Sequence, residues 1–105
     1  MDLRQLRQFV AIAEERSFRR AAERLHISQP PLTVALQRLE SDIGVQLLDR
    51  NRQGVRLTPA GEAFLQEARR TLAQAQSAVD IAQRAAQGKL GTLRLSFGPS
   101  AGLAL

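Results

Sequence analysis

The chain has 105 residues, enough for one domain with an appendage, and its net charge is +5. It contains no cysteine and one histidine, which excludes disulfide frameworks, thiolate metal sites and histidine-rich metal sites. The basic balance favours a polyanionic partner, and the lack of a signal-peptide core or a membrane-length apolar run predicts an intracellular, cytoplasmic protein that enters no membrane.

Two short helices are predicted at the start of the chain. Asp2 and Gln5 have the spacing of a capping box, and apolar residues follow at helical intervals. Ser17 is placed to cap the second helix, which carries two small alanines where a neighbouring helix must cross closely. His26 then falls in a turn, and we expect it to be a turn residue and nothing more.

A third helix is expected to begin at a pair of prolines. Because a residue before proline avoids the helical region, we expect regular helix from Pro31 rather than from Gln29. Ser28 is expected to be a poor N-cap, since prolines lack the N–H groups that it would bind. Gly44 is expected to end the helix. Residues 17–40 are thus predicted to form a helix-turn-helix, whose second helix would be the recognition helix that enters the major groove of DNA.

A two-stranded wing is predicted after the third helix. Residues 45–48 read as a strand, residues 49–54 as a polar loop and residues 55–57 as a returning strand. Three arginines are expected on this wing, two near its tip and one on a strand: Arg50, Arg52 and Arg56.

A long helix is predicted to follow, opened by Thr58 as cap and Pro59 at the first helical position. Its apolar residues recur in steps of three and four over three heptads, more than one small core could cover. We therefore expect a seam between two chains, rather than a helix that folds back on its own domain. The residues of this dimerisation seam are expected to be Leu65, Ala68, Leu72, Ala75, Val79 and Ala82.

The end of the chain is expected to belong to a further domain. Residues 92–97 alternate as a strand with no sheet to join, and a lone strand is unstable in water. The sequence therefore predicts a mainly α fold, a winged helix-turn-helix followed by a long dimerisation helix. The expected divisions are a DNA-binding domain at 1–58, a linker helix at 59–87, and a hinge and first strand of a missing domain at 88–105.

No catalytic constellation can be assembled from these residues. The single histidine lies in a turn with no pocket implied, and residues 88–91 lack the spaced glycine and the Ser or Thr of a phosphate loop. We therefore expect no enzyme activity, no cofactor and no metal.

The exposed face of the third helix predicts binding to double-stranded DNA. Gln29 can pair with adenine through two hydrogen bonds, and Thr33 can bind a base or a phosphate. Pro30 and Val34 can contact a thymine methyl group, and Gln37 lies one turn further along the same face. The wing arginines would reach phosphates or the minor groove.

Two other readings compete with DNA binding. One is a protein-interaction winged helix whose basic face is incidental, although such a module would not need these polar side chains beside wing arginines. The other is a basic amphipathic helix on a membrane surface, which the alanine-rich seam disfavours because it lacks large apolar anchors.

A specific string of motifs runs through residues 1–97. It comprises Leu3-Arg4-Gln5-Leu6 with Phe9 and Ala13, Ser17-Phe18, Ala21-Ala22, Leu25, Ser28-Gln29-Pro30, Leu32-Thr33, Leu36, Leu39-Glu40, Gly44-Val45-Gln46-Leu47-Leu48, Arg50, and Gly54-Val55-Arg56-Leu57-Thr58-Pro59-Ala60-Gly61. In this combination and order, the chain resembles the N-terminal part of a LysR-type transcriptional regulator.

The resemblance implies a winged helix-turn-helix, a linker helix that dimerises, and an effector-binding domain similar to periplasmic binding proteins. A homodimer through residues 59–87 is expected, with a tetramer possible only in a longer protein. A small-molecule inducer would act only through the absent domain. The expected operator is a pair of inverted half-sites.

The resemblance also assigns roles on the third helix. Gln29, Pro30 and Thr33 match family positions that contact DNA. Val34-Ala35 departs from the family, in which a polar and often arginine-containing pair follows. This departure predicts a half-site that favours A·T pairs through methyl contacts.

Overall fold

The computed structural model describes residues 1–88. The strand predicted at 92–97, and most of the segment assigned to a further domain, lie outside the described residues. The chain divides into two units, Met1–Leu72 and Ala73–Leu105.

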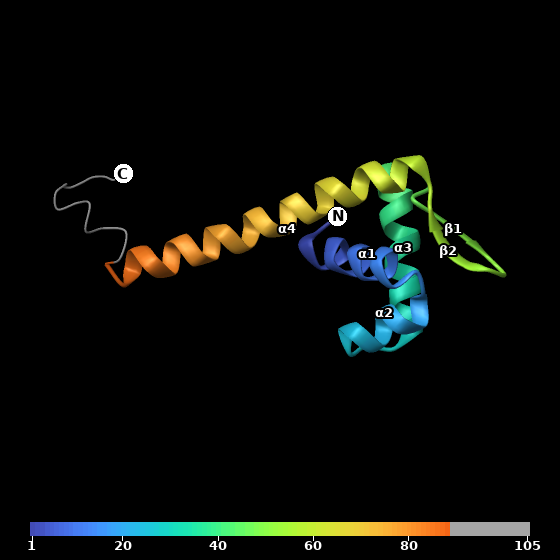
Figure 1. Ribbon diagram of the computed structural model, residues 1–105, viewed down its shortest axis with the longest axis horizontal. Helices are drawn as coiled ribbons and strands as arrows, with labels where there is room; N and C mark the ends of the chain where they lie inside the picture. Colours follow the sequence, from blue (N-terminus) through green and yellow to red (C-terminus); the bar gives the residue numbers. More distant parts are fainter. Residues whose placement is uncertain (89–105) are drawn as a thin grey trace. The chain divides into compact units, whose positions relative to one another are not determined.

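The first unit contains three helices, a hairpin and the start of a fourth helix (Figure 1). The elements in chain order are α1 (Leu3–Glu15), α2 (Phe18–Leu25), α3 (Gln29–Ile43), β1 (Leu48–Asn51), β2 (Gly54–Leu57) and α4 (Pro59–Ala86). This order confirms the predicted winged helix-turn-helix followed by a long helix. The compact unit nevertheless continues to Leu72, well past the division expected at residue 58.

The first two helices begin at the predicted caps. The Asp2 carboxylate accepts a hydrogen bond from the Gln5 amide at 2.8 Å, and the Gln5 side chain accepts one from the Asp2 amide at 3.2 Å, which completes a capping box. The Ser17 hydroxyl accepts from the Arg20 amide at 3.1 Å at the start of α2. His26 ends α2 in the left-handed region at φ 58°, which confirms it as a turn residue.

Helix α3 begins two residues earlier than expected. Gln29 is already helical although it precedes a proline, and the prolines occupy positions of the first turn. The first-turn N–H groups have no intrahelical partner, so the prolines remove no hydrogen bond there. Ser28 makes no side-chain cap, as predicted, and Gly44 ends the helix at φ 80°.

The wing is offset from its predicted position. β1 starts at Leu48 and runs through the segment expected to be a loop, so only a two-residue turn separates it from β2. The turn is stabilised by Asn51, whose side-chain oxygen accepts from the Gln53 amide at 2.8 Å. Where β1 begins, the amides of Leu47 and Leu48 donate to a carboxylate of α3.

The first part of α4 completes the core of the first unit. The rings of Phe64 and Phe9 meet edge to face with their centroids 5.2 Å apart. Leu65 and Ala68 are only 8% and 2% exposed within this core, and Leu72 packs at its edge. The prediction that Leu65 and Ala68 form a seam between chains is therefore wrong, because the helix does fold onto its own domain over these turns.

The second unit carries the remaining turns of α4. Ala75, Val79 and Ala82, the other residues of the predicted seam, belong to this part of the helix, and Val79 is 49% exposed. Among the helices of residues 1–88, none combines the length and the apolarity needed to cross a membrane.

Candidate nucleic-acid interface

The outward face of α3 is a row of residues that points away from the core. Pro30, Val34, Gln37 and Ser41 are all exposed, and Val34 retains 47% of its surface. At 100° per residue these positions fall opposite the buried leucines that anchor the helix. The anchors are Leu32, Leu36 and Leu39. The helix therefore presents a continuous strip of small, apolar and amide side chains.

Gln29 and Thr33 lie on the flank of α3 that faces the wing, and both are half-buried. The Thr33 hydroxyl lies 3.5 Å from the Gln29 carbonyl oxygen, a long contact within the same helix. The five predicted reading residues thus divide into an outward row of three and a flanking pair.

Glu40 joins α3 to the wing, a role that was not predicted from the sequence. Its carboxylate accepts from the amides of Leu47 and Leu48 at 2.7 and 3.1 Å. An acidic residue shortly before a helix-ending glycine is a weak signal for this role, because spacing alone does not show that the chain turns back onto the carboxylate.

Arg50 is held against the body rather than at the wing tip. It lies on β1 opposite Val55, and its guanidinium carbon is 4.1 Å from the centroid of the Phe18 ring. Stacking of a planar guanidinium on an aromatic face restrains the side chain and keeps its charge. Arg50 also lines a hollow of about 260 Å³ together with Gln29, so the structure brings these two predicted residues together.

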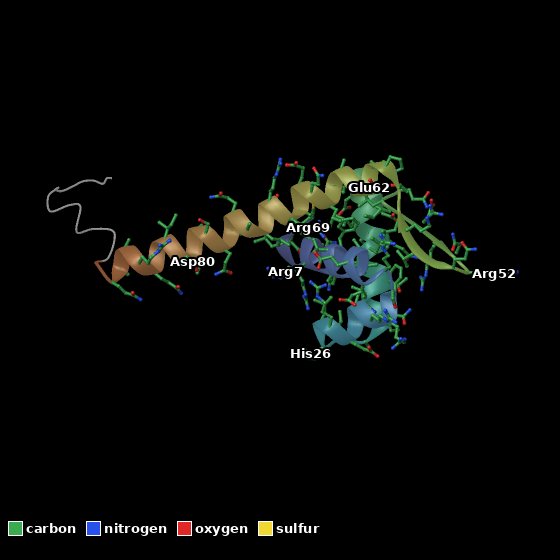
Figure 2. All side chains as sticks on the ribbon, in the orientation of Figure 1. Arg7, His26, Arg52, Glu62, Arg69 and Asp80 are labelled. Carbon is green, nitrogen blue, oxygen red and sulfur yellow. The ribbon has the colours of Figure 1, made fainter. Side chains whose placement is uncertain are left out.

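The other two wing arginines occupy different places. Arg52 lies in the turn at the tip of the hairpin, as predicted (Figure 2). Arg56 is on β2 opposite Asp49, one residue along from the Arg50–Val55 pair. Because side chains alternate between the two faces of a strand pair, Arg56 points to the face opposite that of Arg50. The three arginines therefore do not form one cluster.

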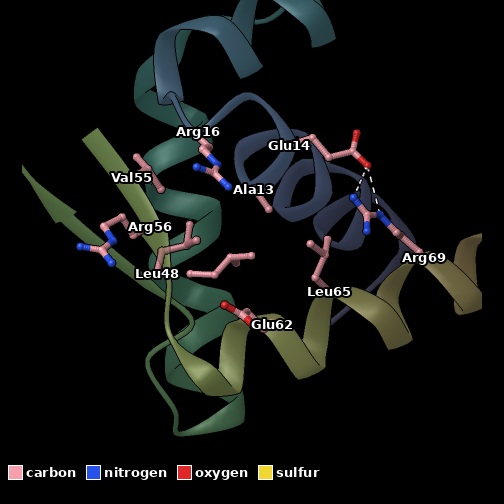
Figure 3. Close-up of a pocket in the computed structure, with 10 residues that line it drawn as sticks. Ala13, Glu14, Arg16, Leu48, Val55, Arg56, Glu62, Leu65 and Arg69 are labelled. Atoms are coloured by element: carbon pink, nitrogen blue, oxygen red, sulfur yellow. Dashed lines mark hydrogen bonds and ion pairs between the residues drawn. The ribbon is translucent and has the colours of Figure 1, made fainter. Parts of the chain in front are cut away.

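A larger cavity of about 470 Å³ lies among α1, the wing and the start of α4 (Figure 3). Its walls carry charges of both signs, including Arg56 on the wing and Glu62 at the start of α4. On its rim the Glu14 carboxylate accepts two hydrogen bonds from Arg69, at 2.8 and 3.1 Å, and pairs with Arg24 at 2.8 Å. The Glu14 carboxylate is engaged by two arginines, and the cavity wall mixes acidic and basic side chains rather than forming a uniformly basic surface.

The pKa of Glu14 is lowered from its ordinary value. The main cause is the hydrogen bond from Arg69, with a further contribution from Arg24, while partial desolvation acts in the opposite direction. This carboxylate links α1 to α2 and α4, and its role is structural. Within residues 1–88, no cluster of three or more His, Cys, Asp or Glu side chains could hold a metal ion.

Comparisons with known proteins place this geometry among DNA-binding regulators. Residues 3–62 match the family described as "Bacterial regulatory helix-turn-helix protein, lysR family". The chain is 50% identical over 97 residues to the HTH-type transcriptional regulator TfdT of Cupriavidus pinatubonensis, which covers 92% of this chain and 42% of TfdT. It is 47% identical over 97 residues to the HTH-type transcriptional regulator BudR of Klebsiella aerogenes, which covers 92% of this chain and 68% of BudR.

Two solved structures match the described fold closely. A CbnR_DBD–DNA complex has a TM-score of 0.79 and 50% identity, over 82% of this chain and 99% of that chain. A BenM_DBD complex with catB site 1 DNA has a TM-score of 0.82 and 45% identity, over 84% of this chain and 99% of that chain. The chain spans less than half of TfdT and 33% of the related regulator TfdS.

Proposed function

The chain belongs to the LysR family of bacterial regulatory helix-turn-helix proteins, and we propose that it binds double-stranded DNA sequence-specifically as the DNA-binding part of a transcriptional regulator. The observation that carries the proposal is the outward row on α3, a strip of small, apolar and amide side chains bordered by arginines. The two similar structures, at 45% and 50% identity, are complexes with DNA.

In this proposal α3 enters the major groove and its outward row contacts base edges. Val34 and Pro30 offer apolar contacts to thymine methyl groups, and Gln37 offers an amide to adenine. Gln29 and Thr33 lie on the wing-side flank, where they reach the edge of the groove. The half-buried state of these two side chains limits their motion and lowers the entropic cost of ordering them on DNA.

The wing arginines are proposed to act on the DNA backbone in different ways. Arg52 at the tip is free to reach a minor groove or a phosphate beyond the recognition helix. Arg50 is proposed to contact a phosphate beside the start of α3, and Arg56 a phosphate on the other face of the wing. These contacts supply affinity rather than base discrimination.

A homodimer is proposed to form through the exposed turns of α4. Ala75, Val79 and Ala82 supply a stripe at intervals of four and three, typical of a helix that packs against another. Such a dimer would read an inverted repeat with half-sites about one helical turn apart. In a longer protein, tetramer formation and an inducer response would depend on a further domain.

The relatives are transcriptional regulators, so the proposed activity is binding rather than catalysis. Their organisms are bacteria, whose DNA lies in the cytoplasm, and we infer that this protein acts there. The competing hypothesis remains a protein-interaction module with an incidental basic face. Such a module would not require the side chains of the outward row of α3.

Selection of bound duplexes from a random DNA pool by the 105-residue chain, at two salt concentrations, tests the proposal. An enriched inverted repeat at both concentrations is the expected result. Binding without enrichment that disappears as salt rises would reduce the activity to phosphate attraction and contradict sequence-specific reading. No binding at either concentration would favour the interaction module.

A further inference from the structure

Helix α3 lies between two hollows, each with arginines in its wall. The hollow on the wing side contains Arg16 and Arg50 and has a volume of about 260 Å³. The hollow on the opposite side lies between α3 and the start of α1, and has a volume of about 390 Å³. Its walls carry Arg4, from α1, and Arg38, from the flank of α3 that faces α1.

Four arginines of these hollows, two in each, have no acidic partner among the described residues. Across residues 1–88, no carboxylate lies within 4.0 Å of Arg4, Arg38, Arg16 or Arg50. By contrast, Arg69 and Arg24 are each paired with acidic residues at 2.8 Å on the side of the body that faces α4. Basic charge on both flanks of α3 therefore stays available for a ligand.

Acidic groups in the two hollows are few. Asp2 lines the α1-side hollow, but one of its carboxylate oxygens already accepts a bond from the Gln5 amide at 2.8 Å. Arg19, on the wing side, is paired with Glu23 at 2.8 Å and adds little free charge. Each hollow therefore keeps two arginines whose charge no acidic side chain cancels.

The dimensions of DNA give these two hollows a common role. An α-helix with its side chains is about 10–12 Å across, and the major groove is about 12 Å wide. A helix that fills the groove brings both of its flanks against the phosphates that border it, and these phosphates belong to opposite strands.

We propose that the two hollows hold phosphates of opposite DNA strands, so that the protein grips the groove from both sides. Arg4 and Arg38 contact the strand on the α1 side. Arg16 and Arg50 contact the strand on the wing side, with Arg50 kept in place by the Phe18 ring. This inference rests on the proposed function and adds the α1-side contacts, which fix the rotation of α3 about its own axis.

The salt dependence of binding measures each contact. Using a duplex enriched in the selection experiment, we expect Arg38→Gln and Arg4→Gln each to lower the slope of log K against log salt by about 0.9. The loss of affinity between 50 and 200 mM salt then becomes about 3.5-fold smaller for each variant. Arg38→Lys, which keeps the charge, should retain the slope.

Arg70→Gln is the matched control. It removes the same charge from an exposed arginine of α4 that is paired with Glu67 at 3.0 Å, and its slope should stay unchanged. An equal fall in slope for this control would show a general effect of net charge and would overturn the inference. An unchanged slope in both Arg38→Gln and Arg4→Gln would overturn it as well.

Neutral methylphosphonates, placed one at a time on either strand, test which strand each hollow holds. A neutral group at the phosphate of Arg38 should weaken DNA binding by the unchanged chain but cause no further loss of affinity in Arg38→Gln. A neutral group at the phosphate of Arg50, on the opposite strand, should likewise weaken binding by the unchanged chain and cause no further loss of affinity in Arg50→Gln. Coupling of both arginines to one strand would overturn the two-sided grip and leave sequence-specific binding intact, whereas failure of the unchanged chain to bind any duplex would overturn both.

Discussion

Val34 is the side chain on which the base preference of α3 depends most. It is 47% exposed in the middle of the outward row, where an apolar side chain offers methyl contact and no hydrogen bond. Val34→Arg should therefore shift one position of the selected half-site from an A·T pair toward guanine, by about 1–3 kcal/mol of discrimination. Selection from a random pool measures this shift.

Ser41→Arg is the control for that substitution. Ser41 lies in the same row about two turns away, so an arginine there adds the same charge without entering the same base step. The Ser41→Arg substitution should raise the affinity for all DNA sequences alike. If Val34→Arg keeps the base preference of the unchanged chain, Val34 does not read the groove.

Gly61 is the residue where α4 approaches the wing too closely for any side chain. A Cβ built there would lie 2.0 Å from the Leu47 carbonyl oxygen and 2.9 Å from its carbon, both of them backbone atoms. Gly61→Ala should therefore destabilise the protein by at least about 1–3 kcal/mol, although alanine is the better helix former. Each kcal/mol corresponds to a fall in Tm of about 4–8 °C in a domain of this size.

Thermal unfolding followed by circular dichroism measures this loss. Gln66→Ala, an exposed change in the same helix, should leave the Tm nearly unaltered. A Tm for Gly61→Ala equal to or above that of the unchanged chain would mean that the close approach of α4 to Leu47 does not persist in solution.

At the scale of the elements, helix positions could be read from the sequence better than strand positions. The caps at Asp2 and Ser17 and the stop at Gly44 are local signals, and each was predicted correctly. The wing was misplaced, and β1 begins where Glu40, a side chain on another element, accepts hydrogen bonds from the amides of Leu47 and Leu48. Local propensity carries no information about such a partner.

The link between α1, α2 and α4 depends on the ionised carboxylate of Glu14. Arg69 and Arg24 lower the pKa of this group below the ordinary value of 4.5. A carboxyl whose pKa is lower in the folded state stabilises the fold above its unfolded pKa and loses that contribution as pH falls through the folded value. The stabilisation should therefore be complete at neutral pH and begin to fall below about pH 4.5.

Glu14→Gln removes the charge and tests this dependence. The unfolding midpoint in urea should be lower than that of the unchanged chain at pH 7, and the difference should shrink as pH falls below about 4.5. Glu23→Gln is the control, because its partner Arg19 lies on the same helix and the pair is largely exposed. A difference that stays constant from pH 7 to pH 3 would contradict the role of ionised Glu14.

At the scale of the whole molecule, periodicity in α4 could not distinguish packing within the chain from packing between chains. The stripe begins in the chain's own core, where Leu65 and Ala68 are buried, and continues to Val79, which is half exposed. Apolar residues at helical spacing indicate that one face of a helix is packed against another element, but they do not identify that element. The outward row of α3 raised no such ambiguity, because the positions of its exposed side chains follow from the buried leucines on the opposite face of the helix.

The exposed turns of α4 lead to the last prediction, which concerns assembly. If Ala75, Val79 and Ala82 pack against a second copy, a charge among them would be buried without a partner. Val79→Glu should therefore shift the sedimentation behaviour from dimer to monomer and weaken binding to an inverted repeat far more than binding to a single half-site. Ser77→Glu adds the same charge on the opposite face by helical spacing, and it should leave the dimer intact. If Val79→Glu stays dimeric, the dimer must form through another surface, and the spacing of the half-sites would no longer be set by this part of α4.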